Sequence, residues 1–151
     1  MSAVVIVGIG NPFRGDDGLG HIAAELVGRE SGMEVRLTDG EPTRLVDAWA
    51  DSRIAIVLDA IRGGAPPGTI HRFEVGHTQL PSAFKHPSTH GAGLESAVAL
   101  GQALDLNPEI LIIYGVEPED MSEGRGLSAP VEESLPILVE SVLEEVRTAC
   151  A

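Results

Sequence analysis

The sequence predicts a doubly wound α/β fold, in which a mostly parallel sheet is flanked by helices on both faces. Short β-branched runs alternate along the chain with segments of helical period, the order expected of βα units. Three of these runs are apolar throughout, as is typical of parallel strands covered on both faces. The 151 residues are 43% hydrophobic but only 3% aromatic, which suits aliphatic layers. We expect residues 1–151 to form a single domain.

The first half of the chain contains three predicted strands and two predicted helices. The strands span residues 3–7, 33–38 and 54–58. The helices span residues 20–29 and 42–49. Polar residues alternate with apolar ones in the second strand, which places it near an edge of the sheet. Gly28 and Gly32 can end the first helix, and Thr43 can cap the second.

The second half of the chain continues the same alternation. Predicted strands span residues 69–75 and 110–114, and predicted helices span residues 94–104 and 131–146. The last helix has the most regular apolar stripe of the chain, with Pro130 suited to its first turn. Residues 76–89 have no clear period. We expect them to form the longest loop, and long loops of compact domains often carry function.

Charge and cysteine content exclude several classes of function. Asp and Glu outnumber Lys and Arg by 23 to 10, a net charge of -13, so nucleic acids and anionic membranes would be repelled. No apolar run is long enough to span a bilayer, and the N-terminal run lacks the basic start of a signal peptide. Cys150 is the only cysteine, which excludes an internal disulfide and fits a reducing compartment. We therefore expect a cytoplasmic protein.

The glycine-rich segment after the first strand, residues 8–20, is the first candidate site. Open parallel sheets bind ligands beyond the carboxyl ends of their strands, and this segment lies at such an end. Asp16 and Asp17 place two adjacent carboxylates there. Either of them could instead cap the following helix.

Asp59 and His90 are the other candidate site residues. Asp59 ends a buried strand, where it could bind a ligand or close an Asx-type turn. His90 lies between the irregular loop and the next helix, although a lone histidine is more often structural. Together with Asp17 these residues would supply two oxygens and one nitrogen. Such a set suits a divalent ion such as nickel or zinc and leaves coordination positions open.

Several other catalytic and binding motifs are missing. A dinucleotide-binding loop requires Gly at the sixth position of Gly-x-Gly-x-x-Gly, where this chain has Phe13. A Rossmann-like nucleotide-binding protein nevertheless stays open as an alternative. The sequence contains no phosphate-binding loop, no zinc-protease helix motif and no nucleophile elbow, and Cys150 lies too near the chain end to be a good nucleophile. A hydrolase with this sequence would have to use carboxylates and a metal.

The motifs above resemble those of the hydrogenase maturation endopeptidases. The resemblance runs in order through nearly the whole chain: Gly8-x-Gly10-Asn11, Asp16-Asp17-Gly18-x-Gly20, Leu58-Asp59-Ala60, Ser88-Thr89-His90 and Gly115-Val116-x-Pro118. It implies a sheet of about five strands between two layers of helices. It also implies that the acidic residue of the glycine-rich loop, the Asp after the third strand and the loop His contact the metal. These positions are Asp17, Asp59 and His90 in this chain.

The resemblance further implies an activity and a partner. Such an enzyme removes the C-terminal extension of a nickel-iron hydrogenase large-subunit precursor after nickel insertion. Nickel would be carried by the substrate and bound transiently, with Asp17, Asp59 and His90 in the catalytic site and Asp16 as a spare candidate for the base. A nickel chaperone without cleavage is a further alternative. We expect a monomer that binds neither nucleic acid nor membrane.

Overall fold

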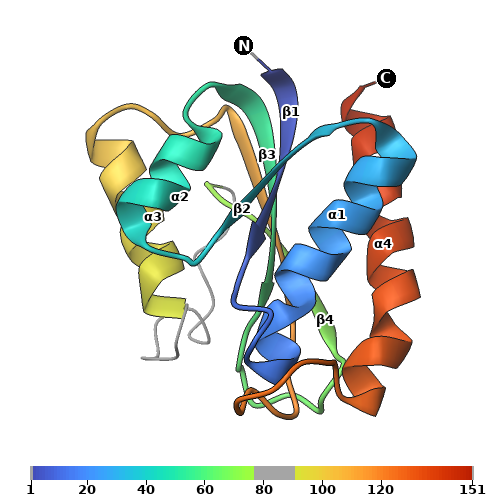
Figure 1. Cartoon of the computed structure of the whole chain (residues 1–151). Coiled ribbons are helices and arrows are strands. Elements are labelled where there is room, and N and C mark those ends of the chain that lie inside the picture. The colour runs from blue at the N-terminus through green and yellow to red at the C-terminus, as the bar shows by residue number, and fades with distance from the viewer. Residues whose placement is uncertain (1, 77–90, 151) are drawn as a thin grey trace.

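The computed structural model describes residues 2–76 and 91–150 and confirms the predicted α/β class. A mostly parallel five-stranded sheet lies between two layers of helices (Figure 1). The strands are β1 (Ser2–Ile9), β2 (Glu34–Thr38), β3 (Ser52–Ala60), β4 (Ile70–Glu74) and β5 (Ile110–Val116). The helices are a 3-10 turn η1 (Gly15–Gly18), α1 (Leu19–Ser31), α2 (Pro42–Trp49), α3 (Gly91–Ala103) and α4 (Ala129–Ala149).

The sheet has the strand order β2-β1-β3-β5-β4. Parallel pairing joins β2, β1, β3 and β5, and β4 runs antiparallel along β5 at the edge. This arrangement confirms that residues 33–38 lie at an edge and that residues 69–75 pair back. The carboxyl ends of the four parallel strands therefore all lie on one side of the sheet, at the bottom in Figure 1. We call this side the carboxyl edge, as distinct from the edge strands β2 and β4.

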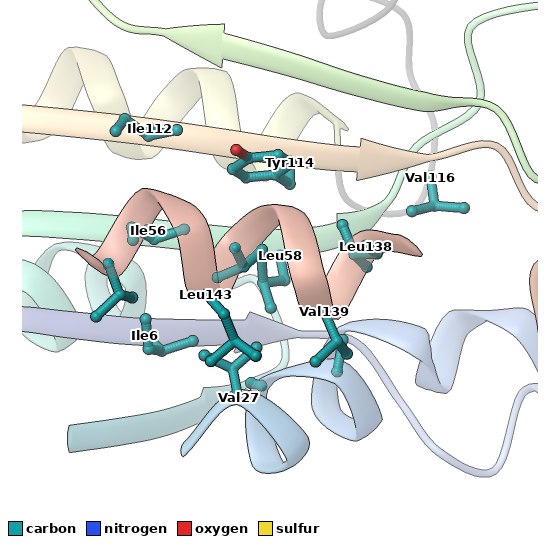
Figure 2. Packing of buried hydrophobic residues seen from close by; sticks show 14 of the residues in the cluster. Ile6, Val27, Ile56, Leu58, Ile112, Tyr114, Val116, Leu138, Val139 and Leu143 are labelled. Atoms are coloured by element: carbon teal, nitrogen blue, oxygen red, sulfur yellow. The ribbon is translucent and has the colours of Figure 1, made fainter. Parts of the chain in front are cut away.

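Alternating side chains of the strands build two hydrophobic cores, one on each face. Ile6, Ile56 and Leu58 pack against α1 and α4, represented in Figure 2 by Val27 and Leu143. The opposite alternation, including Val57 of β3, packs against α2 and α3. Full burial of each such side chain contributes about 1.5 to 3 kcal/mol, so the two cores together hold the sheet and its strand ends in place.

The helix ends follow the sequence in one case and depart from it in another. Gly32 ends α1 in a left-handed conformation, with φ of 74°, and its N–H donates to the carbonyl of Gly28, as predicted. The prediction that Thr43 can cap α2 is wrong. Glu41 is the cap instead: it directly precedes α2, and its carboxylate accepts from the N–H groups of Thr43 and Arg44, while Thr43 already lies inside the helix.

A polar cluster ties the end of α4 to the edge of the sheet. The carboxylate of Glu145 accepts from Arg72 of β4 at 2.6 Å and from the hydroxyl of Tyr114 of β5 at 2.9 Å. Burial, and then the hydrogen bond to Glu145, raises the pKa of Tyr114 to about 12. Burial opposes the charge of Glu145, but the hydrogen bonds from Arg72 and Tyr114 outweigh it and hold the pKa of Glu145 below its usual range.

The helices of the described residues include none that is both long and apolar enough to cross a membrane.

Glu145→Gln should lower the free energy of unfolding by about 1 to 2 kcal/mol at pH 7, because a charged hydrogen-bonding partner of Arg72 and Tyr114 is lost. The folded-state pKa of Glu145 is depressed, so its contribution is present above the unfolded pKa and is lost as the pH falls through the lower folded value. Urea unfolding of both proteins at pH 7 and at pH 3 measures this. The difference between them should shrink at pH 3.

Glu144→Gln is the control, because Glu144 is an exposed neighbour that pairs only with Arg147 among the interactions described. This change should alter the free energy of unfolding by less than about 0.5 kcal/mol. Equal losses in the two variants would contradict a stabilising role for the Glu145 cluster.

Candidate active site

The loop that follows β1 turns back sharply at Gly10. Gly10 has φ of 144°, and a Cβ placed on it would lie 1.9 Å from the carbonyl oxygen of Asp17. That carbonyl accepts the N–H of Asn11 at 3.0 Å, which closes the loop onto η1. Only glycine allows this approach, so the glycine pattern of the sequence serves to bring Asp17 against the end of β1.

Asp17 and Asp59 lie at the same place in the fold. A Cβ on Gly20, three residues after Asp17, would lie 2.5 Å from the carbonyl oxygen of Leu58, the residue before Asp59. Across the sheet, Gly8 pairs with Leu58, so the end of β1 runs beside Asp59. Both carboxylate residues are buried, with 0% and 1% exposure. The structure thus brings together the two predicted carboxylates at the carboxyl edge of the sheet.

Asp59 lies within β3, paired with Gly115 of β5, and not in a turn after the strand. Ala55, Val57 and Ile61 belong to the core on the α2 and α3 side, so the alternation of the strand places Asp59 on that face. The start of α3 lies at the same edge, because a Cβ on Gly93 would be 2.4 Å from the carbonyl oxygen of Gly40, just beyond β2. This geometry argues against an Asx-type turn at Asp59, and its role as a ligand stays a prediction.

The alternative that Asp16 or Asp17 caps α1 is wrong. Both residues lie in η1, one turn before the helix, and the cap position of α1 is Gly18, without a capping side chain. The chain makes a 3-10 turn first because the loop must fold back at Gly10 before α1 can start. The two carboxylates are therefore directed to contacts other than the helix end.

Asp16 is fully buried and accepts four hydrogen bonds from one distant segment. Its Oδ2 accepts from the N–H groups of Glu119 and Asp120 at 2.8 and 2.9 Å. Ser128 donates its Oγ hydrogen to Oδ2 and its N–H to Oδ1, both at 2.7 Å. The structure gives Asp16 a connecting role that the sequence did not suggest, while its use as a base stays a prediction.

Glu117 is a buried acidic residue at this edge that the sequence patterns did not single out. It is buried, with 3% exposure, and its Oε1 accepts from the N–H groups of Gly63 and Ala65 at 2.7 and 3.2 Å. His71 lies 3.4 Å from the same oxygen. The strand-end rule that selected Asp59 could have selected Glu117, since it directly follows β5. The acidic C-terminal region around it concealed this signal.

His90, the predicted nitrogen ligand, lies outside the described residues. Within residues 2–76 and 91–150, no group of three or more His, Cys, Asp or Glu side chains is placed to hold a metal ion. The described part of the chain thus contains the two predicted oxygen donors, and the three-ligand set stays a prediction. Buried carboxylates of this kind are paired or bind metal ions in proteins, so Asp17 and Asp59 fit a hard or borderline cation.

These features define an α/β protein whose candidate active site lies where its parallel strands end. Comparison with known proteins then identifies the family. Residues 21–145 match the hydrogenase maturation protease family model, and the chain belongs to this family.

Relatives of known sequence agree with this family. The chain is 32% identical over 146 residues to the hydrogenase expression/formation protein HupD of Thiocapsa roseopersicina, covering 93% of this chain and 66% of that protein. It is 29% identical over 150 residues to HupD of Rhizobium leguminosarum bv. viciae, covering 96% of this chain and 74% of the relative. The chain therefore spans about two thirds to three quarters of these relatives.

Solved structures share the fold. The [NiFe] hydrogenase maturation protease HybD from Thermococcus kodakarensis has a TM-score of 0.76 at 26% identity, over 93% of this chain and 97% of that one. The hydrogenase maturating endopeptidase HybD from E. coli has a TM-score of 0.84 at 24% identity, over 97% and 93%. The five-stranded architecture described above is thus the architecture of these proteins.

Gly10→Ala should destabilise the protein by at least about 2 kcal/mol more than Gly32→Ala. Both glycines have positive φ, but a Cβ on Gly10 meets the Asp17 carbonyl, whereas a Cβ on Gly32 meets nothing within 4 Å. Gly32→Ala should cost only the backbone strain of about 1 to 2 kcal/mol. Chemical denaturation of both variants measures the difference, and equal losses would show that the close approach at Gly10 is unimportant.

Proposed function

We propose that this protein is an endopeptidase that removes the C-terminal extension of a nickel-iron hydrogenase large-subunit precursor after nickel insertion. Family membership supports a peptidase of hydrogenase maturation, and the names of the relatives point to the same pathway. The observation that carries the proposal is that two buried carboxylate residues, Asp17 and Asp59, lie where the parallel strands end, the usual place for a ligand in such a sheet.

Nickel in this proposal belongs to the substrate. Asp17 and Asp59 would each offer a carboxylate oxygen to the ion, and His90, which precedes α3, would offer a nitrogen. Such a set leaves positions for the ligands that the precursor already provides. When bound, the ion would supply Lewis acidity and hold the scissile peptide near the two carboxylates. The chain's own residues would orient the precursor and handle the protons of the attacking water.

The two alternatives have weaker support. A Rossmann-like nucleotide protein would need a pyrophosphate at the start of α1, where Asp16 and Asp17 add negative charge to the segment that must receive it. A nickel chaperone would bind the ion by itself. The proposed set of Asp17, Asp59 and His90 supplies three ligands, whereas an ion that a protein keeps is more often closed by four, so the set suits an ion shared with the precursor.

The setting of the reaction is part of the proposal. The partner is the hydrogenase precursor, and neither nucleic acid nor membrane takes part. The high acidity and the single Cys150 support a monomer acting in the cytoplasm.

Incubation of the protein with nickel-loaded precursor should shorten the precursor by the mass of its tail, and nickel-free precursor should stay intact. Asp17→Asn, Asp59→Asn and His90→Ala should each slow tail removal by at least about 100-fold, because each change removes a ligand or an acid–base group from the reacting site. Mass spectrometry of the intact precursor over time measures the rate.

Glu144→Gln is the matched control, because it also removes one carboxylate but does so at an exposed position on α4. This variant should cleave the precursor as fast as the unchanged protein. Undiminished cleavage in Asp17→Asn or His90→Ala would contradict the site. Tight nickel uptake without any cleavage would favour the chaperone, and thermal stabilisation by a dinucleotide would favour the nucleotide-binding alternative.

A further inference from the structure

The connection between β5 and α4, residues 117–128, contacts both segments that carry the candidate site. Its first residue, Glu117, meets the loop after β3, and residues from Glu119 to Ser128 meet the loop after β1. We propose that Asp16 and Glu117 are positioning residues that lock this connection against both loops and thereby set the places of Asp17 and Asp59. This inference rests on the proposed function, because it assigns a catalytic consequence to the lock.

The contact at Asp16 joins two segments more than 100 residues apart. The four hydrogen bonds to its carboxylate come from Glu119, Asp120 and Ser128. Its own N–H donates to the carbonyl of Asp120 at 2.9 Å. The N–H of Gly15 donates to the carbonyl of Gly124 at 2.8 Å. Asp17 follows in the same 3-10 turn, so any movement of Asp16 is passed on to it.

The contact at Glu117 acts on the loop that leaves Asp59. Its carboxylate accepts from Gly63 and Ala65, and its backbone N–H donates to the carbonyl of Thr69 at 2.9 Å. The N–H of Ile61, two residues after Asp59, donates to the carbonyl of Val116 at 2.9 Å. These bonds join the end of β5 to residues 61–69, the stretch of chain between Asp59 and β4. The position of Asp59 therefore depends on the segment that Asp16 also holds.

The hydrogen bonds of Asp16 favour positioning over proton transfer. An ionised carboxylate has about four lone-pair sites that accept hydrogen bonds. Three donors from the β5–α4 connection share Oδ2, one binds Oδ1, and the side chain is fully buried. A proton taken from water would neutralise the carboxylate and weaken these charge-assisted hydrogen bonds, which hold the connection in place. The substrate-contacting role thus falls to Asp17 and Asp59, and Asp16 acts through them.

The test compares Asp16→Asn and Glu117→Gln with Glu145→Gln. Asp16→Asn and Glu117→Gln each replace a carboxylate that accepts from backbone N–H groups by an amide. Glu145→Gln makes the same replacement in the partly buried cluster on α4, away from the carboxyl ends of the strands. At a temperature where circular dichroism shows all variants folded, steady-state cleavage of nickel-loaded precursor gives kcat and KM. We expect kcat to fall about 10-fold or more in the first two, with KM changed less than about 3-fold, and Glu145→Gln to keep its kcat.

Carbon-13 NMR of aspartate-labelled protein provides a readout that needs no cleavage. The carboxyl signals of Asp17 and Asp59, assigned with their Asn variants, should shift in Asp16→Asn and Glu117→Gln but not in Glu145→Gln. Ser128→Ala is a milder change, because it removes one hydrogen bond and keeps the N–H to Oδ1. It should shift the Asp17 signal and lower kcat by about 2- to 5-fold.

The outcomes separate the possible roles. Loss of cleavage in Asp16→Asn alone, with full kcat in Glu117→Gln and Ser128→Ala, would make Asp16 the base and overturn the proposal. Unmoved Asp17 and Asp59 signals in both principal variants would also overturn it. If the unchanged protein does not cleave any precursor, the proposed function fails, and the NMR comparison still decides whether the lock exists.

Discussion

Parallel pairing of β1, β3 and β5 is the constraint on which the rest of the structure depends. It places the chain after each of these strands at one edge of the sheet, so residues distant in sequence become neighbours there. Asp17, Asp59 and Glu117 all reach this edge for that reason. The two hydrophobic cores, one on each face, keep the register that makes the arrangement possible.

Buried carboxylates are the second feature of this edge, in a chain whose net charge is already -13. Burial of a carboxylate is costly unless hydrogen bonds or an opposite charge compensate it. Asp16 and Glu117 meet this requirement with backbone N–H donors of neighbouring loops. The hydrogen bonds that compensate the burial of these carboxylates also hold the loops against each other, which gives the site a defined shape before any partner binds.

Much of this fold follows from local sequence, but the connections between loops do not. Apolar runs and helical periods predict the strands and helices, because those patterns reflect burial on one or two faces. The strand-end rule also predicts the region of Asp17 and Asp59. The roles of Asp16 and Glu117 could not be predicted, since their partners lie far along the chain or beyond a turn of unknown shape. The possible cap Thr43, and the alternative that Asp16 or Asp17 caps α1, failed for a related reason, because the local path of the chain decides which side chain reaches an N–H.

The central claim is that Asp17 and Asp59 form part of a site that reads the metal state of a hydrogenase precursor. The most direct measurement is the affinity of the protein for nickel-loaded and for nickel-free precursor, by surface plasmon resonance. The account predicts tighter binding of the nickel-loaded form and equal binding of both forms once Asp17 or Asp59 is changed to Asn. Equal binding of both forms by the unchanged protein would contradict it.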